Sequence, residues 1–137
     1  DMATLLRESD YVSLHAPLAD ATRHMIGARE LAAMKPTAIL VNTGRGGLVD
    51  DRALFEALRA GRIAGAGLDV YEGESDAGLK DVAMALLALP NVVGTPHSAA
   101  STREGLARTN MIAARNVVLA LNGGALPRDC LIADGRG

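Results

Sequence analysis

Cysteine, aromatic side chains and long apolar runs are scarce in this chain of 137 residues. The single cysteine, Cys130, excludes an internal disulfide and is consistent with a reducing compartment, so we expect a cytoplasmic protein. Aromatic residues make up only 2% of the sequence, so the core must be built from Leu, Val, Ile, Ala and Met. No stretch is long or apolar enough to span a membrane, and the first residues lack the pattern of a signal peptide, so we expect neither an anchor nor a leader.

The charges are few and are not gathered in blocks. The net charge is −2 with no basic cluster, so we expect no nucleic-acid partner. The three histidines and one cysteine show no metal-ligand spacing, and no Gly-x-Ser-x-Gly elbow is present. The composition, 49% hydrophobic and 22% charged, is typical of one modest globular domain. The chain begins with Asp1 instead of Met, which predicts a piece of a longer protein or a processed product.

Short apolar segments alternate with helical patterns along the chain. The sequence predicts strands at 10–17, 38–41, 63–71 and 91–97, and helices at 21–34, 48–60, 81–87 and 101–121. In the helix at 21–34, Gly27 separates a short first turn from the main part. This alternation predicts right-handed crossovers and an α/β fold, with a parallel sheet and helices on both faces.

Several residues predict where the helices begin and end. Asp50 or Asp51 is a suitable N-cap for the helix at 48–60, and Gly61 is placed for the position after its end. Ser101 and Glu104, three residues apart, fit a capping box at the start of the last helix.

The segment 39–47 is an apolar strand that ends in a glycine-rich turn carrying Arg45. In open α/β sheets, ligands bind just beyond the carboxyl ends of such strands. The planar, permanently charged guanidinium of Arg45 suits a carboxylate or phosphate. The alternative is a surface arginine on a connecting loop.

Other polar side chains fall at the ends of predicted strands: His15, Asp69 and His97, with Glu74 in the loop after one strand. These ends share one edge of a parallel sheet, so the side chains can meet in one crevice. Arg45 can hold a substrate carboxylate, and His97 can exchange a proton with a carbonyl or alcohol oxygen near neutral pH. Glu74 can orient the imidazole and favour its protonated form. This trio suits reversible reduction of a 2-oxo acid, with the hydride supplied by a cofactor.

The segment 35–50 resembles the signature of the D-isomer-specific 2-hydroxyacid dehydrogenases, and the segments 13–17, 61–74 and 91–97 resemble neighbouring blocks of that family in the right order. The resemblance implies a Rossmann-like doubly wound sheet, NAD or NADP as cofactor, a small 2-oxo or 2-hydroxy acid as substrate, and a homodimer. Within the family we favour a phosphoglycerate dehydrogenase or a glyoxylate/hydroxypyruvate reductase type.

The resemblance also implies roles for particular residues. Arg45 matches the substrate-binding arginine and His97 the catalytic acid/base, and Glu74 rather than Glu72 matches the partner of that histidine. Asp69 matches the aspartate at the nicotinamide end. The full set of cofactor-binding positions is His15, Pro17, Thr43, Gly44, Arg45, Asp69 and His97.

The chain departs from the family pattern in what it does not contain. Members are much longer, and neither the Gly-x-Gly-x-x-Gly loop for the pyrophosphate nor the acidic residue for the ribose is in this sequence. We therefore expect a partial Rossmann sheet lacking its first two strands, with 1–122 as a partial NAD(P)-binding domain and 123–137 as an irregular tail. Placing the missing strands between 10–14 and 39–41 predicts a sheet with a break, and a chain that is poorly stable or associates through exposed strand edges.

Three functions remain open at this point. The first is the carboxyl-terminal part of an NAD(P)-dependent D-2-hydroxyacid dehydrogenase. The second is a dinucleotide-sensing binding protein, like the transcriptional co-repressors that share the family resemblance. The third is an inactive truncated product that keeps the catalytic residues by descent. We expect the parent protein to be an enzyme and this chain alone to be inactive.

Overall fold

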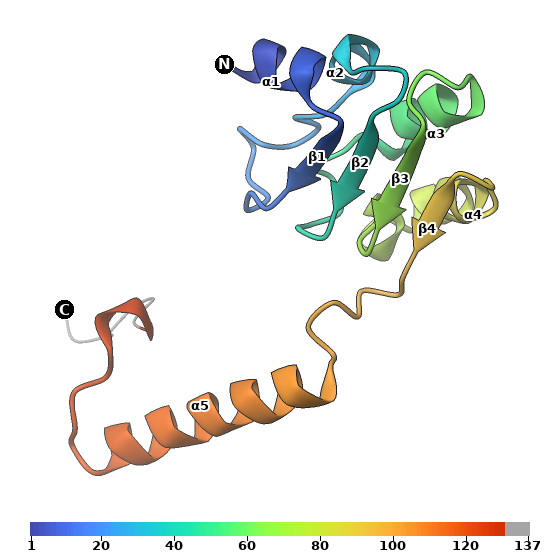
Figure 1. Ribbon diagram of the computed structural model, residues 1–137. Helices are drawn as coiled ribbons and strands as arrows, with labels where there is room; N and C mark the ends of the chain where they lie inside the picture. The colour runs from blue at the N-terminus through green and yellow to red at the C-terminus, as the bar shows by residue number, and fades with distance from the viewer. Residues whose placement is uncertain (131–137) are drawn as a thin grey trace. The chain divides into compact units, whose positions relative to one another are not determined.

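A computed structural model describes residues 1–130. The chain divides into two units, the first spanning residues 1–99 and the second beginning at residue 100. The elements of the first unit, in chain order, are α1 (Met2–Glu8), β1 (Tyr11–Leu14), α2 (Ala28–Ala33), β2 (Ile39–Asn42), α3 (Asp51–Arg59), β3 (Gly65–Leu68), the 3-10 turns η1 (Glu72–Glu74) and η2 (Ala77–Leu79), α4 (Lys80–Leu87) and β4 (Val92–Gly94) (Figure 1).

The four strands form one parallel sheet in the order β1-β2-β3-β4. In the register, Leu14 pairs with Asn42, Asn42 with Leu68, and Leu68 with Gly94. The carboxyl ends of all four strands are therefore level with one another at one edge of the sheet. The predicted α/β class with a partial, Rossmann-like parallel sheet is confirmed.

The predicted break in the sheet is wrong. β1 and β2 are direct neighbours, paired over four residues from Tyr11 with Ile39 to Leu14 with Asn42. Any further strands of a Rossmann order would therefore lie beyond the outer edge of β1, and not between β1 and β2. The sheet is continuous over the described strands, while the expected poor stability or association through exposed strand edges stays a prediction.

The sequence predicts helices on both faces of the sheet, but in the structure α2, α3 and α4 lie on the same face (Figure 1). Among the described elements, α2 packs against α3 and α3 against α4, in a row on one face of the sheet (Figure 1). Each crossover is right-handed and advances by one strand in the same direction, so each helix comes to the same side. The core lies between this row and the sheet. Its largest fully buried aliphatic side chains are Leu6, Ile26, Leu31, Leu40, Leu48, Leu54, Ile63 and Leu86.

The opposite face of the sheet is open within the described residues. Tyr11 is 72% exposed and Val93 is 73% exposed, whereas Val12 and Leu14, which alternate with Tyr11 along β1, are buried. This alternation follows from the two-residue period of a strand.

The helix caps follow the sequence in most places. The side chain of Asp50 is the N-cap of α3 and accepts a hydrogen bond from the Ala53 N–H at 3.0 Å. Gly61 follows the helix with a φ of +64°, the left-handed conformation expected there. The start of the last helix differs, because Thr102 and not Ser101 is its N-cap and accepts from the Gly105 N–H at 3.0 Å.

The predicted helix at 21–34 divides at Gly27 as expected, but only its second part is helical. Its first part is a turn, tied by the Thr22 hydroxyl, which donates to the Pro17 carbonyl at 2.7 Å. The helix begins only after Gly27, its N-cap. The turn brings the segment 15–27 back over the ends of the strands, where it contributes to the site described below.

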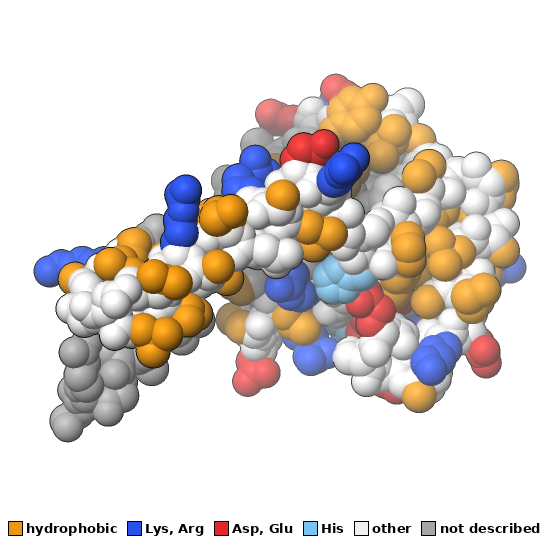
Figure 2. All heavy atoms as spheres, turned by 90° about the horizontal axis from the view of Figure 1, so that it is seen from below, with side chains coloured by type: hydrophobic (Ala, Val, Ile, Leu, Met, Phe, Trp, Pro, Cys, Tyr) orange, Lys and Arg blue, Asp and Glu red, His pale blue; other side chains and the backbone are white. Residues whose placement is uncertain are grey.

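The second unit contains α5 (Arg103–Leu121) and the 3-10 turn η3 (Arg128–Cys130). None of the residues of α5, all of which the structure describes, is buried, and its exposed apolar side chains include Leu106, Met111, Ile112 and Leu121 (Figure 2). No helix in the described part of the chain is long and apolar enough to cross a membrane. Of the predicted irregular tail, residues 131–137 lie outside the described residues.

Candidate functional site

The predicted site residues lie in the loops that follow the four strands at the level edge of the sheet. Figure 2 views this edge from below, and histidine and acidic side chains lie beside one another on it. The structure divides these residues into two groups. One group lines a cavity between the loops after β1 and β2, and the other forms a hydrogen-bonded cluster at the ends of β3 and β4.

The turn that carries Arg45 is built by Asn42, the last residue of β2. Asn42 is 2% exposed, and its side chain accepts from the Gly44 N–H and donates to the Arg45 carbonyl, each at 3.1 Å. Gly46 follows where no side chain fits, because a Cβ there would lie 2.2 Å from the Tyr71 carbonyl oxygen. The turn is therefore fixed both by the buried amide and by the backbone after β3.

Arg45 itself is exposed. Its guanidinium donates to the Gly44 carbonyl at 2.7 Å. Among the described residues it forms no ion pair with a carboxylate, in contrast to Arg29, Arg59 and Lys35. Most of the fork of donors is therefore free for an anionic ligand.

A cavity of about 680 Å³ lies beside this turn. Five of the seven predicted cofactor-binding residues line it: His15, Pro17, Thr43, Gly44 and Arg45. His15 is anchored at its rim by a hydrogen bond of 2.8 Å between its Nε2 and the Ser13 hydroxyl. The segments 15–18 and 43–45, far apart in the sequence, thus line one cavity with both polar and apolar side chains.

The second group centres on Glu74 and His97. The Nδ1 of His97 lies 2.6 Å from one carboxylate oxygen of Glu74, and the other oxygen accepts from the Tyr71 N–H at 2.7 Å. The His97 side chain is about half exposed (51%), and its φ is +51°. Because Nδ1 faces the carboxylate, Nε2 is the nitrogen left to face a ligand. Glu74, and not Glu72, contacts His97.

Asp69 directly follows β3 and is held by hydrogen bonds from the segment after β4. It is 3% exposed, and its carboxylate accepts from the Thr95 hydroxyl, the Ser98 N–H at 2.8 Å and the Ala99 N–H at 2.9 Å. These hydrogen bonds, that of Thr95 above all, hold the pKa of Asp69 below its usual range. Asp69 does not line the cavity of Arg45. It fixes the loop 95–99, and with it His97.

A third set of residues was missed by sequence reasoning. Glu72, Asp51 and His24 form a hydrogen-bonded cluster beneath the loops, and Glu72 and Asp51 are 7% and 3% exposed. No local signal in the sequence identifies them, since their separations along the chain are 21 and 48 residues.

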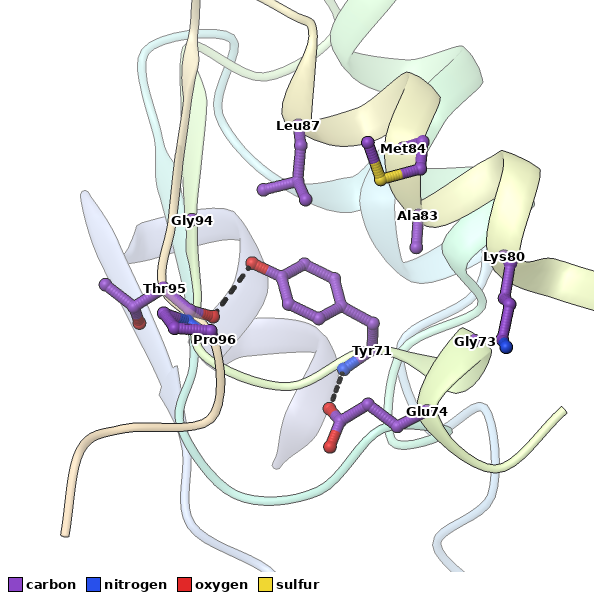
Figure 3. Close-up of a pocket in the computed structure, with 10 residues that line it drawn as sticks. All are labelled: Tyr71, Gly73, Glu74, Lys80, Ala83, Met84, Leu87, Gly94, Thr95 and Pro96. Carbon is purple, nitrogen blue, oxygen red and sulfur yellow. Dashed lines mark hydrogen bonds between the residues drawn. The ribbon is translucent and has the colours of Figure 1, made fainter. Parts of the chain in front are cut away.

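A separate, mainly apolar cavity of about 470 Å³ lies between α4 and the end of β4. Figure 3 shows the ring of Tyr71 at its centre, with Met84 and Leu87 of α4 on one side and Thr95 and Pro96 on the other. The Tyr71 hydroxyl bonds the Thr95 carbonyl at 3.3 Å. This tyrosine thus links the turn that carries Glu74 to the strand end that precedes His97.

Among the described residues, no group of three or more His, Cys, Asp or Glu side chains can hold a metal ion. The groups available at the site are an exposed guanidinium, a carboxylate–imidazole pair and a cavity with both polar and apolar lining residues. Such groups can bind an anionic substrate and exchange one proton with it.

Comparison with known proteins identifies the family. Residues 1–99 match the model of the D-isomer specific 2-hydroxyacid dehydrogenase, NAD binding domain. The chain is 53% identical over 123 residues to a glyoxylate reductase of Aeropyrum pernix, an alignment covering 90% of this chain and 36% of that protein. It is 46% identical over 123 residues to a D-3-phosphoglycerate dehydrogenase of Methanocaldococcus jannaschii, covering 90% of this chain and 22% of the relative.

Comparison with solved structures points to the same family. The NAD-complexed crystal structure of a D-isomer specific 2-hydroxyacid dehydrogenase from Lactobacillus delbrueckii ssp. bulgaricus superimposes with a TM-score of 0.85 at 42% identity, covering 93% of this chain and 41% of that one. The chain thus spans well under half the length of these relatives. With the parallel sheet and the family model over residues 1–99, the chain belongs to the D-isomer specific 2-hydroxyacid dehydrogenase family.

Proposed function

We propose that this chain is the carboxyl-terminal part of the nucleotide-binding region of an NAD(P)-dependent D-2-hydroxyacid dehydrogenase, of the glyoxylate/hydroxypyruvate reductase or phosphoglycerate dehydrogenase type. Arg45 binds the carboxylate of a small 2-oxo acid, His97 is the acid/base, and Glu74 orients His97. Relatives at 45–53% identity carry glyoxylate reductase, hydroxypyruvate reductase and D-3-phosphoglycerate dehydrogenase as names, which supports this substrate class.

The observation that carries the proposal is the pair of Glu74 and His97, 2.6 Å apart, at the same sheet edge as the exposed guanidinium of Arg45, which forms no ion pair with a described carboxylate. A carboxylate on Nδ1 fixes the orientation of the ring, so Nε2 can deliver a proton to a carbonyl oxygen or take one from an alcohol. The guanidinium holds the neighbouring carboxylate of the same substrate through two parallel hydrogen bonds.

The cavity of Arg45 fits one end of a dinucleotide. It offers imidazole, hydroxyl and guanidinium groups, together with Gly44, where a Cβ would come within 3.0 Å of Leu48 and 3.2 Å of the Leu14 carbonyl. No Gly-x-Gly-x-x-Gly loop for the pyrophosphate is in the sequence, so these residues would hold only part of the cofactor. The hydride would come from a nicotinamide cofactor held there. This chain's residues supply the binding of the substrate and the proton.

The test is steady-state kinetics of the full-length enzyme that carries this chain, with glyoxylate and hydroxypyruvate. His97→Ala should lower kcat by roughly 10²- to 10⁴-fold, the usual contribution of a positioned acid/base. Arg45→Lys should mainly raise KM and also slow turnover, because lysine keeps the charge but loses the two-pronged geometry. Unchanged kinetics in either variant would refute the assigned role.

Lys35→Met is the matched control. It breaks an exposed ion pair of 2.8 Å with Asp10, which precedes β1 and so lies at the opposite edge of the sheet. Its kinetic constants should equal those of the unmodified enzyme. A loss as large as that of His97→Ala would show that the assay measures folding and not the chemistry of the site.

We expect the isolated chain to be inactive, since it carries the acid/base and the arginine without a pyrophosphate loop. Oxidation of NADH with glyoxylate by the pure chain would contradict this expectation. The extension of the nucleotide-binding domain to residue 122 and the homodimer stay predictions, as does the contact between Asp69 and the cofactor.

A further inference from the structure

Glu72 is a buried carboxylate that the proposed chemistry does not use. Its side chain is 9% exposed, and both of its oxygens are bonded. One lies 2.7 Å from Nε2 of His24, and the other accepts from the Asp51 N–H at 3.1 Å. In return, the Glu72 N–H donates to the Asp51 carboxylate at 2.9 Å. A carboxylate this deeply buried is costly unless it is bonded, so the contacts define its position tightly.

The partners of Glu72 come from different loops of the site. His24 belongs to the segment 15–27, of which residues 15–18 line the cavity of Arg45, and its backbone N–H donates to the Gly47 carbonyl at 2.7 Å. His24 has a φ of +51°, a conformation that L residues rarely adopt. Asp51 is the first residue of α3, which follows the Arg45 turn. Glu72 therefore ties together the loops after β1, β2 and β3.

Glu72 also begins the short turn η1, which ends at Glu74. In the same turn, Glu74 accepts from the Tyr71 N–H and holds His97. The Tyr71 carbonyl in turn presses against Gly46, next to Arg45, where a Cβ would lie only 2.2 Å away. Moving Glu72 would therefore move Glu74 relative to Arg45.

We propose that Glu72 is a positioning residue that, through His24 and Asp51, holds the Glu74–His97 pair in register with the Arg45 turn. This inference rests on the proposed function for its kinetic consequences but not for its structural ones. A displacement of about 1 Å between catalytic groups can lower the rate on the order of 10²-fold. Loss of the hydrogen bonds of Glu72 should therefore change the kinetics measurably.

Two variants test the hydrogen bond between Glu72 and His24, one at each partner. Glu72→Gln keeps the shape of the side chain and an oxygen for the Asp51 N–H, but removes the charge that faces His24. His24→Asn removes the bond to Glu72 with a residue that tolerates a positive φ, and leaves the contacts between Glu72 and Asp51 in place. The second variant keeps the test decisive if the first fails to fold.

Asp50→Ala is the matched control. It removes the N-cap of α3, one residue from Asp51, without removing a bond of Glu72. Its loss of stability represents what a purely structural perturbation at this helix end does.

The first measurement is long-range ¹⁵N–¹H NMR of the imidazoles in the full 137-residue chain at pH 8, which reports the share of the Nδ1-protonated tautomer. We expect that share to fall for His97 in Glu72→Gln and His24→Asn, although neither residue touches His97, and to be unchanged in Asp50→Ala. Tautomer shares that are equal in all four proteins would overturn the proposal.

The second measurement is kinetics of the full-length enzyme. Both variants should lower kcat roughly 10- to 100-fold and raise KM for the 2-oxo acid. The double variant should lose no more than the worse single one, because both substitutions break one tie. Losses equal to that of Asp50→Ala would overturn the positioning role. If the unmodified enzyme reduces no 2-oxo acid, the proposed function fails, while the NMR comparison still decides the role of Glu72.

Discussion

Replacing Asp51 with asparagine should make the stability of the fold less dependent on pH between about 4 and 7. Asp51 is 3% exposed at the start of α3. Burial raises the pKa of its carboxyl from 3.8 to about 6. The charges of Glu72 and Asp50 act in the same direction, while the Glu72 N–H and His24 favour the ionised form.

The stability of the folded chain should fall as the pH rises, because the folded chain binds the proton of Asp51 more tightly than the unfolded chain does. Between pH 3.8 and about 6, the folded chain keeps a proton on Asp51 that the unfolded chain has released. The favourable contribution is therefore complete below pH 3.8 and is lost as the pH rises through 6. The two pKa values differ by about two pH units, and each unit corresponds to about 1.4 kcal/mol, so the loss approaches about 3 kcal/mol.

The asparagine of this variant would have no proton to lose, and its side-chain oxygen can still accept from the Glu72 N–H. The free energy of unfolding of Asp51→Asn, relative to that of the unmodified chain, should therefore rise by up to about 3 kcal/mol from pH 4 to pH 7. Urea unfolding followed by circular dichroism at pH 4.5, 5.5, 6.5 and 7.5 measures this difference. The control is Asp20→Asn, at an exposed position in the loop after β1.

Parallel stability curves for Asp51→Asn and the unmodified chain across this range would refute the reasoning. They would mean that Asp51 ionises in the folded chain as easily as in the unfolded one. The buried cluster with Glu72 would then be better solvated than its exposure of a few per cent indicates.

Three further predictions concern the same unit. Gly46→Ala should destabilise the fold by roughly 1–3 kcal/mol in urea unfolding, because the new methyl would lie 2.2 Å from the Tyr71 carbonyl; an unchanged midpoint would show that the two loops are not in contact. Leu54→Ala, at a fully buried position of α3, should cost about 2–5 kcal/mol in the same assay, and a loss below about 1 kcal/mol would place Leu54 outside the core. Asp69→Asn should destabilise the chain more at pH 7 than at pH 3, because the stabilising effect of a carboxylate with a lowered pKa is present above its unfolded value and lost as the pH falls through the folded one; an equal loss at both pH values would contradict this.

Much of the candidate site was predictable because it depends on position along a strand. Arg45 and His97 follow strands directly, and Glu74 lies in the loop after one, so the rule that parallel strands end at one edge was enough to group them. The rule did not show which residues share a cavity. Arg45 lines one cavity with His15 and Thr43. The buried carboxylate of Asp69 instead accepts hydrogen bonds from the loop 95–99.

The sequence by itself determined the order of the helices and strands, the N-cap of α3 to within Asp50 or Asp51, the glycine at Gly61 after its end, and the family, because these depend on residues within a few positions of one another. The tertiary structure decided that β1 pairs directly with β2, that α2, α3 and α4 share one face, and that Glu72 joins His24 to Asp51. These features arise from packing between segments 21 to 48 residues apart, where burial and hydrogen bonding in three dimensions, and not local periodicity, select the partners.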